Sequence, residues 1–358
     1  MTGTLERTWA GAPAWRLLLS AGGLLAVGCG GSLAACVVHL GGLYGLAETS
    51  EAWHRVDVVQ AGAAAVAGGW LCWRVLRRTG LPYGQLSPRA AGLGAAAVVC
   101  AGASVWTAVP SADPTVWEPV PFAVTLTWLA WEVTRSHGLR LQKQIRLADA
   151  AERTRWGQVA VLAAIATAVG GVASTLLTRV LPWAADSSVL PVMQDDQLTV
   201  LGIDSLSALG AGAVMVVAVE DVVVVAATIA LLRAARRPVW QIYALVCVVE
   251  VLLHGYMGAA AVGMAPFAAG RIWLYLRFGY LTPLMAGHGA YDVVHTLLME
   301  LPPLARVVMM LPVLAALVWV EWHTESQPPA PVKDDRPQAG PESATAAPDG
   351  GSATPDPS

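Results

Sequence analysis

Ionisable residues lie inside stretches of this chain that are apolar enough to cross a membrane. Residues 208–232 carry two acids in mid-span, residues 240–260 carry an acid and a histidine, and residues 281–299 carry two histidines and an acid. These residues are Glu220, Asp221, Glu250, His254, His288, Asp292 and His295. A charged side chain in the bilayer core costs on the order of 3 kcal/mol, so it is rare unless it faces partners, water or a substrate. We therefore expect the function to depend on these three segments.

The composition predicts an all-α, polytopic helical membrane protein. The chain has 358 residues, of which 56% are hydrophobic and 13% are charged, and its mean hydropathy is +0.56. Lipid offers no hydrogen-bond partner to free backbone groups, so each segment inside the bilayer must be helical. The lipid bilayer is thus the first expected partner. The net charge of −3 gives no broad basic surface, so no nucleic acid partner is expected.

Hydropathy predicts about ten transmembrane helices. They cover residues 17–40, 56–76, 90–109, 119–134, 157–180, 208–232, 240–260, 261–278, 281–299 and 304–321, and Pro266 and Gly270 break the eighth. Arginine-rich loops at 74–89, 135–155 and 233–237 alternate with acidic or neutral loops, which predicts that both termini lie inside the cell. The bias to Ala, Gly, Val and Arg, with few Lys, indicates a GC-rich bacterial genome and hence the bacterial plasma membrane.

Four regions are expected along the chain. Residues 1–16 are a cytoplasmic N-terminus, residues 17–200 carry the N-terminal helices, residues 201–321 carry the ionisable residues, and residues 322–358 are a disordered cytoplasmic tail. The tail is rich in Pro, Gly, Ala and Ser and cannot bury a core. The five Cys lie in apolar segments without zinc-type spacing, so we expect them to be packing residues.

Spacing groups the ionisable residues on helix faces. Residues four apart share one face of an α-helix, so Glu250 lies beside His254, and His288 lies beside Asp292. His295 continues the second stripe. Glu220 and Asp221 are adjacent and point about 100° apart, so only one of them is expected to face a common centre. A buried carboxylate can act as a general base towards water, and imidazoles can relay protons or stabilise an oxyanion.

The order and spacing of these residues resemble the CPBP family of intramembrane proteases, which includes CAAX prenyl proteases and bacteriocin-processing enzymes. That family carries EExxxR, FxxxH and HxxxN or HxxxD on successive helices. The corresponding stretches here are EDVVVV at 220–225, EVLLH at 250–254 and HGAYD at 288–292. The resemblance covers residues 208–300 and implies that residues 201–321 form a catalytic bundle.

The resemblance also implies a role for each residue. Glu220 would activate water with help from His254, while His288 and Asp292 would form the oxyanion side of the site. Asp221 would support these groups. Glu250 and His295 lie outside the family's motifs, and we expect both to have a supporting, structural role. The reaction would be hydrolysis of a peptide bond in a membrane-anchored protein or peptide, without a covalent intermediate. No cofactor is expected, although Glu, His and Asp in one cavity also suit zinc or iron, so a divalent metal stays open.

The chain departs from the family pattern at three positions. Asp221 stands where the motif has its second Glu, Val225 stands where it has arginine, and Glu250 stands where it has Phe. No arginine replaces Val225 at that turn. Two alternatives therefore stay open, namely a catalytically degraded scaffold or regulator, and a proton- or metal-coupled transporter that uses the same intramembrane residues.

Overall fold

The computed structural model describes residues 13–46, 49–79, 87–108, 119–145, 148–186, 189–193, 197–201 and 203–299. Within these ranges every regular element is a helix, as predicted, turns and loops connect the helices, and one isolated β-bridge joins Val192 to Gly258. The predicted N-terminal segment lies largely outside the described residues. The predicted tenth helix and the C-terminal tail lie entirely outside them.

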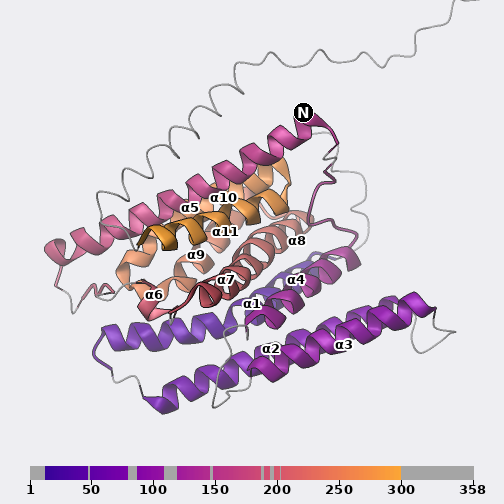
Figure 1. The fold of residues 1–358 in the computed structure, drawn as a ribbon, viewed down its shortest axis with the longest axis horizontal. Helices are drawn as coiled ribbons and strands as arrows, with labels where there is room; N and C mark the ends of the chain where they lie inside the picture. Colours follow the sequence, from indigo (N-terminus) through magenta and orange to yellow (C-terminus); the bar gives the residue numbers. More distant parts are fainter. Residues whose placement is uncertain are drawn as a thin grey trace, which may run out of the picture.

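The N-terminal half folds into five helices. They are α1 (Ala14–Leu43), α2 (Ser50–Arg78), α3 (Pro88–Ala108), α4 (Pro119–Ser136) and α5 (Ala150–Ala184). The helices α2 and α3 lie side by side at one edge of the molecule (Figure 1). They can approach closely because Gly68 has no side chain: a Cβ there would lie 2.7 Å from the Cβ of Ala101.

The C-terminal half begins with a short helix and a long central segment. The short helix is α6 (Gln197–Val200), and the central segment joins α7 (Leu206–Val216), the π-helix η1 (Val217–Ala227) and α8 (Thr228–Ala234). The central segment runs between α1 and α4 on one side and α5, α10 and α11 on the other (Figure 1). The η1 residues from Val222 to Ala227 are fully buried, and the two acids before them, Glu220 and Asp221, are buried as well.

The remaining elements complete the bundle around η1. They are α9 (Val239–Leu253), the 3-10 turns η2 (Gly255–Met257) and η3 (Ala259–Met264), α10 (Ala265–Phe278) and α11 (Leu281–Met299). Each of α9, α10 and α11 contacts η1. The three segments that carry the ionisable residues are therefore neighbours in space.

The predicted count of ten transmembrane helices is not confirmed. Among the described residues, six helices are long and apolar enough to cross a membrane. They are Ala14–Leu43, Ser50–Arg78, Pro88–Ala108, Ala150–Ala184, Leu206–Ala234 and Ala259–Phe278. The seventh predicted helix is shorter than expected, because α9 ends at Leu253. There the chain turns through Gly258, whose φ of +66° favours glycine, and pairs with Val192.

Of the two predicted breaks in the eighth helix, the one at Pro266 coincides with the change from the 3-10 helix η3 to α10, whereas α10 continues unbroken through Gly270. Pro266 lies in the first turn of α10, where its missing N–H has no helical partner to lose. Gly270 allows α10 to pack closely on α5, since a Cβ there would lie 2.8 Å from the Cβ of Ala166. Both residues thus help α10 to begin and to pack.

Candidate active site

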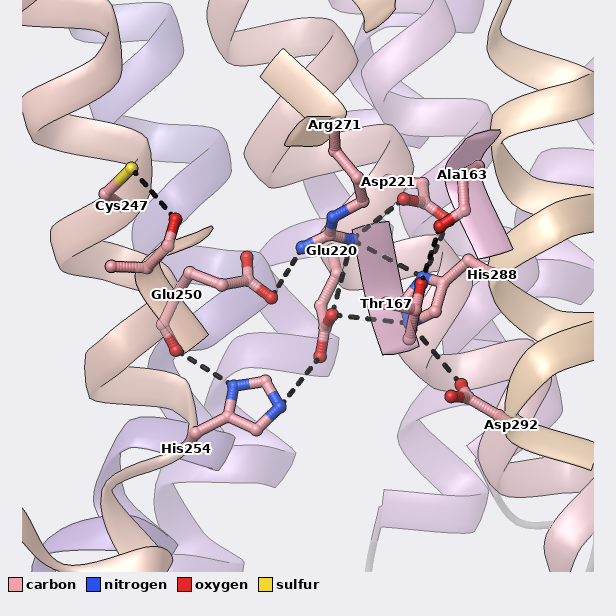
Figure 2. A network of polar contacts seen from close by, with 11 residues as sticks. Ala163, Thr167, Glu220, Asp221, Cys247, Glu250, His254, Arg271, His288 and Asp292 are labelled. Atoms are coloured by element: carbon pink, nitrogen blue, oxygen red, sulfur yellow. Dashed lines mark hydrogen bonds and ion pairs between the residues drawn. The ribbon is translucent and has the colours of Figure 1, made fainter. Parts of the chain in front are cut away.

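A single buried guanidinium, that of Arg271 on α10, lies among the acids of the other helices (Figure 2). Its Nη1 donates to Asp221 Oδ1 at 2.8 Å and lies 3.3 Å from Glu220 Oε2. Its Nη2 lies 2.6 Å from Glu250 Oε1, in an ion pair whose angles fall outside hydrogen-bond geometry. Three carboxylates from two helices thus share one cation.

Both acids of η1 face this centre. We expected only one of Glu220 and Asp221 to do so, from the angular spacing of an α-helix. That expectation is wrong because this stretch is a π-helix, whose wider i→i+5 turn sets neighbouring side chains at a smaller angle. Thr228 Oγ1 donates to the carbonyl of Val223 at 2.8 Å, five residues back, at the end of the same π-helix. Short π-helical segments occur often at functional sites.

His288 on α11 joins the centre from the other side. Its Nδ1 lies 3.0 Å from Asp221 Oδ2, within hydrogen-bond distance. Its Nε2 lies 3.4 Å from Asp292 Oδ2 and 3.7 Å from Glu220 Oε2. If Nδ1 carries the proton and donates it to Asp221, Nε2 faces the other two carboxylates. The expected pairing of His288 with Asp292 across one helical turn is present.

His254 approaches Glu220 from the end of α9. Its Nδ1 lies 2.9 Å from the carbonyl oxygen of Glu250, and its Nε2 lies 4.0 Å from Glu220 Oε1. When Nδ1 donates to that carbonyl, the ring is held in one tautomer and Nε2 offers its lone pair towards Glu220. The Glu220 carboxylate therefore lies between the imidazoles of His254 and His288.

Two residues of α10 that we did not predict as site residues complete the cluster. Arg271 is one, and Phe267, one turn before it, is the other. The guanidinium carbon of Arg271 lies 3.6 Å from the centre of the Phe267 ring. The same ring meets His288 edge-on at 5.0 Å and His254 at 6.4 Å. An arginine inside the apolar stretch 261–278 was the available sequence signal, since a charge there needs partners.

Burial decides how the cluster holds its charge. Asp221, Glu250 and Arg271 have no exposed surface, whereas 27% of the Asp292 side chain is exposed. With all four carboxylates ionised and both imidazoles neutral, one positive charge would face four negative ones. An uncompensated charge away from water is costly, so protons must be shared within this set. Such a site can accept and return protons.

Part of the cluster has the donors that a divalent metal needs. One ligand atom from each of Glu220, Glu250 and His254 lies within 4.8 Å of the others. Two oxygens and a nitrogen suit zinc or iron. The guanidinium of Arg271 already engages Glu250, however, and would compete with a cation for that carboxylate.

His295 lies one helical turn beyond Asp292 on α11. Its ring stacks on Tyr291, with centroids 5.4 Å apart and planes at 19°. It continues the stripe of His288 and Asp292 along α11, as predicted, but this contact is with an aromatic neighbour.

An apolar groove of about 980 Å³ runs along the same helices. It lies between α4, α7, η1 and α11, and its lining includes Ala123, Trp128, Ala213, Val217, Gly289 and Val293. The last two are neighbours in sequence of His288 and Asp292. The charged side chains of the cluster do not line the groove, so groove and cluster lie on different faces of shared helices.

Comparison with protein-family models, with curated proteins and with solved structures gives no match for this chain. A functional conclusion must therefore come from the geometry around Arg271 and from the motifs.

Proposed function

We propose that this protein is an intramembrane endopeptidase of the CPBP type, acting in the bacterial plasma membrane with both termini inside. Its substrate is a membrane-anchored protein or peptide. One observation carries the proposal: the Glu220 carboxylate lies between His254 and His288 inside an apolar bundle. A carboxylate held between two imidazoles, away from bulk water, is suited to take a proton from an attacking water.

Each remaining group has a part in this reaction. Glu220 removes a proton from water with His254 beside it, and the hydroxide attacks the peptide carbonyl carbon. When the tetrahedral intermediate collapses, the C–N bond breaks and Glu220 gives the proton to the leaving amine nitrogen. In its imidazolium form His288 donates its Nε2–H to the oxyanion that forms, and Asp292, 3.4 Å from the same Nε2, orients the ring before that bond is made. Asp221 holds the same ring from its Nδ1 side. Asp292, the most exposed of these carboxylates, lies where the site meets its surroundings.

The arginine and the phenylalanine that the family motifs have, and that this chain lacks at those positions, are supplied from another helix. Val225 and Glu250 replace the motif arginine and phenylalanine, and α10 supplies an arginine and a phenylalanine one turn apart. Glu250 itself makes the shortest contact with Arg271. This exchange supports an intact site over a degraded one, since a buried cation without a use would be costly.

The apolar groove supports an apolar substrate segment. Its small lining residues, such as Gly289 and Ala213, permit close approach of another helix. A substrate helix lying there would contact Gly289 and Val293, the sequence neighbours of His288 and Asp292, on a different face of α11 from the cluster.

The test is cleavage in reconstituted membranes, with a panel of membrane-anchored peptides. We expect wild-type cleavage that Glu220→Gln and His288→Ala both abolish and that a chelator spares. Arg277→Gln is the control, because Arg277 is an exposed residue of α10 outside the cluster. Cleavage that survives both substitutions would contradict the proposal.

A metal-dependent hydrolase is the second candidate, and the Glu220, Glu250 and His254 donor set favours it. In that case the chelator abolishes cleavage and added zinc restores it. A folded wild type that cleaves nothing across a broad panel would instead favour a scaffold.

A further inference from the structure

A second polar cluster lies far along the chain from the candidate active site, where α1 begins and where α2 and α4 end. Arg74 near the end of α2 donates through Nη1 to Ser136 Oγ at 2.9 Å, which ties α2 to α4. His137 follows α4, and its Nε2 lies 3.0 Å from Ser20 Oγ on α1. These two contacts hold the three helix ends together.

Positive charge gathers at this junction. The guanidinium carbons of Arg74 and Arg77 lie 4.9 Å and 5.5 Å from the centre of the Trp73 ring. Arg16, at the start of α1, lies over Trp15 at 5.2 Å. Burial, together with the charges of Arg74 and Arg16, lowers the pKa of His137, which places both guanidiniums within electrostatic range of that ring.

This charge has no acidic partner in the described part of the chain. Glu132 is the carboxylate at this end of α4, and Arg78 engages it at 3.0 Å. No ion pair joins a described carboxylate to Arg16, Arg74 or Arg77. The Nε of Arg74 is buried and makes no hydrogen bond with the described residues. The cluster is thus held in place, and no carboxylate of the described residues compensates Arg16, Arg74 or Arg77.

We propose that this cluster binds the phosphate of an anionic phospholipid headgroup. The guanidiniums of Arg16, Arg74 and Arg77 supply donors and charge that fit a phosphodiester. The exposed rings of Trp15 and Trp73 are of the type that lies at the headgroup level of a bilayer. A lipid phosphate is the source, because the three arginines lie at the ends of α1 and α2, which are long and apolar enough to cross a membrane.

The general enrichment of arginine on the inner side of membranes would explain why positive charges are present at this junction, but nothing more. It does not require that a guanidinium be bound to Ser136 with a buried, unpaired Nε, or that two guanidiniums share one indole. The proposal is independent of the proposed peptidase activity, so either can fail alone.

The test is lipid binding to the full chain in nanodiscs that mix phosphatidylglycerol and phosphatidylcholine, read by native mass spectrometry. We expect wild type to retain phosphatidylglycerol preferentially, and Arg16→Gln/Arg74→Gln to lose roughly thirty-fold in that preference. Arg16→Lys/Arg74→Lys should keep most of it. The control Arg155→Gln/Arg277→Gln removes two exposed charges on α5 and α10 and should bind like wild type.

Circular dichroism establishes that each variant is folded. Because Arg16→Lys/Arg74→Lys keeps both positive charges, comparing it with Arg16→Gln/Arg74→Gln shows whether the loss of lipid binding comes from lost charge or from lost packing of the arginine side chains. Equal preference in Arg16→Gln/Arg74→Gln and in the control pair would overturn the proposal. Displacement of the lipid by millimolar inorganic phosphate would overturn the assignment to a lipid source.

Discussion

Replacing Arg271 by methionine removes the cation from three buried carboxylates while keeping an unbranched apolar side chain in its place. In the native protein the guanidinium lies 2.8 Å from Asp221, 3.3 Å from Glu220 and 2.6 Å from Glu250, and none of its surface is exposed. Removing one partner of a buried ion pair costs about 3–5 kcal/mol, because the other charge is left uncompensated. The contact with Phe267 is lost as well.

We therefore expect Arg271→Met to lower the free energy of unfolding by about 3–5 kcal/mol. The double variant Arg271→Met/Glu250→Met should be more stable than the single one, because it also removes a carboxylate that the lost cation compensated. The control is Arg277→Met on the same helix, where the side chain is exposed and the change should stay within about 0.5 kcal/mol.

The assay is equilibrium unfolding in mixed detergent micelles, followed by circular dichroism at a pH that keeps all variants soluble. The free energy of unfolding is compared among three variants: Arg271→Met, Arg271→Met/Glu250→Met and the control Arg277→Met. If Arg271→Met is as stable as Arg277→Met, or if adding Glu250→Met destabilises the protein further, the guanidinium does not compensate the buried carboxylates.

Two further predictions concern packing and pH. Gly287→Ala should lower the unfolding free energy by more than about 2 kcal/mol, because its Cβ would overlap the carbonyl oxygen of Ala160 on α5; in the same unfolding titration Gly210→Ala, with open space around it, should be neutral or stabilising. The pKa of His137 is lowered on folding by burial and by nearby arginines, so the unfolded chain binds more protons. Stability should fall as pH drops from the ordinary histidine value of 6.5 towards the lower folded pKa, and His137→Gln should flatten this part of the profile of melting temperature against pH; equal slopes for both proteins would contradict it.

The sequence pattern predicted the helical fold and singled out seven ionisable residues as candidates for the site. It could do so because a titratable group in an apolar, membrane-spanning stretch is unusual whatever its neighbours are. The pairing of His288 with Asp292 followed from helical spacing alone. Glu220, Asp221, Glu250, His254, His288 and Asp292 lie around Arg271 or in contact with residues that do, and the His295 ring stacks on Tyr291.

Two features of the site could not be predicted from the spacing of residues along the sequence. The inward direction of both Glu220 and Asp221 depends on a π-helix, and α-helical periodicity predicts a different angle between them. The central position of Arg271 depends on how α10 packs against η1 and α9, which is set by tertiary contacts and not by local sequence. The early end of α9 likewise depends on the pairing of Gly258 with Val192.

The central claim is that Glu220 activates water within the Arg271 cluster. It is tested most directly by the cleavage rate of Glu220→Gln in proteoliposomes, beside Glu132→Gln, which alters a buried carboxylate outside the cluster. Loss of a general base predicts a fall of about 10²–10⁴-fold for Glu220→Gln, with Glu132→Gln close to wild type when equally folded. A Glu220→Gln protein that cleaves within a few-fold of wild type would contradict the account.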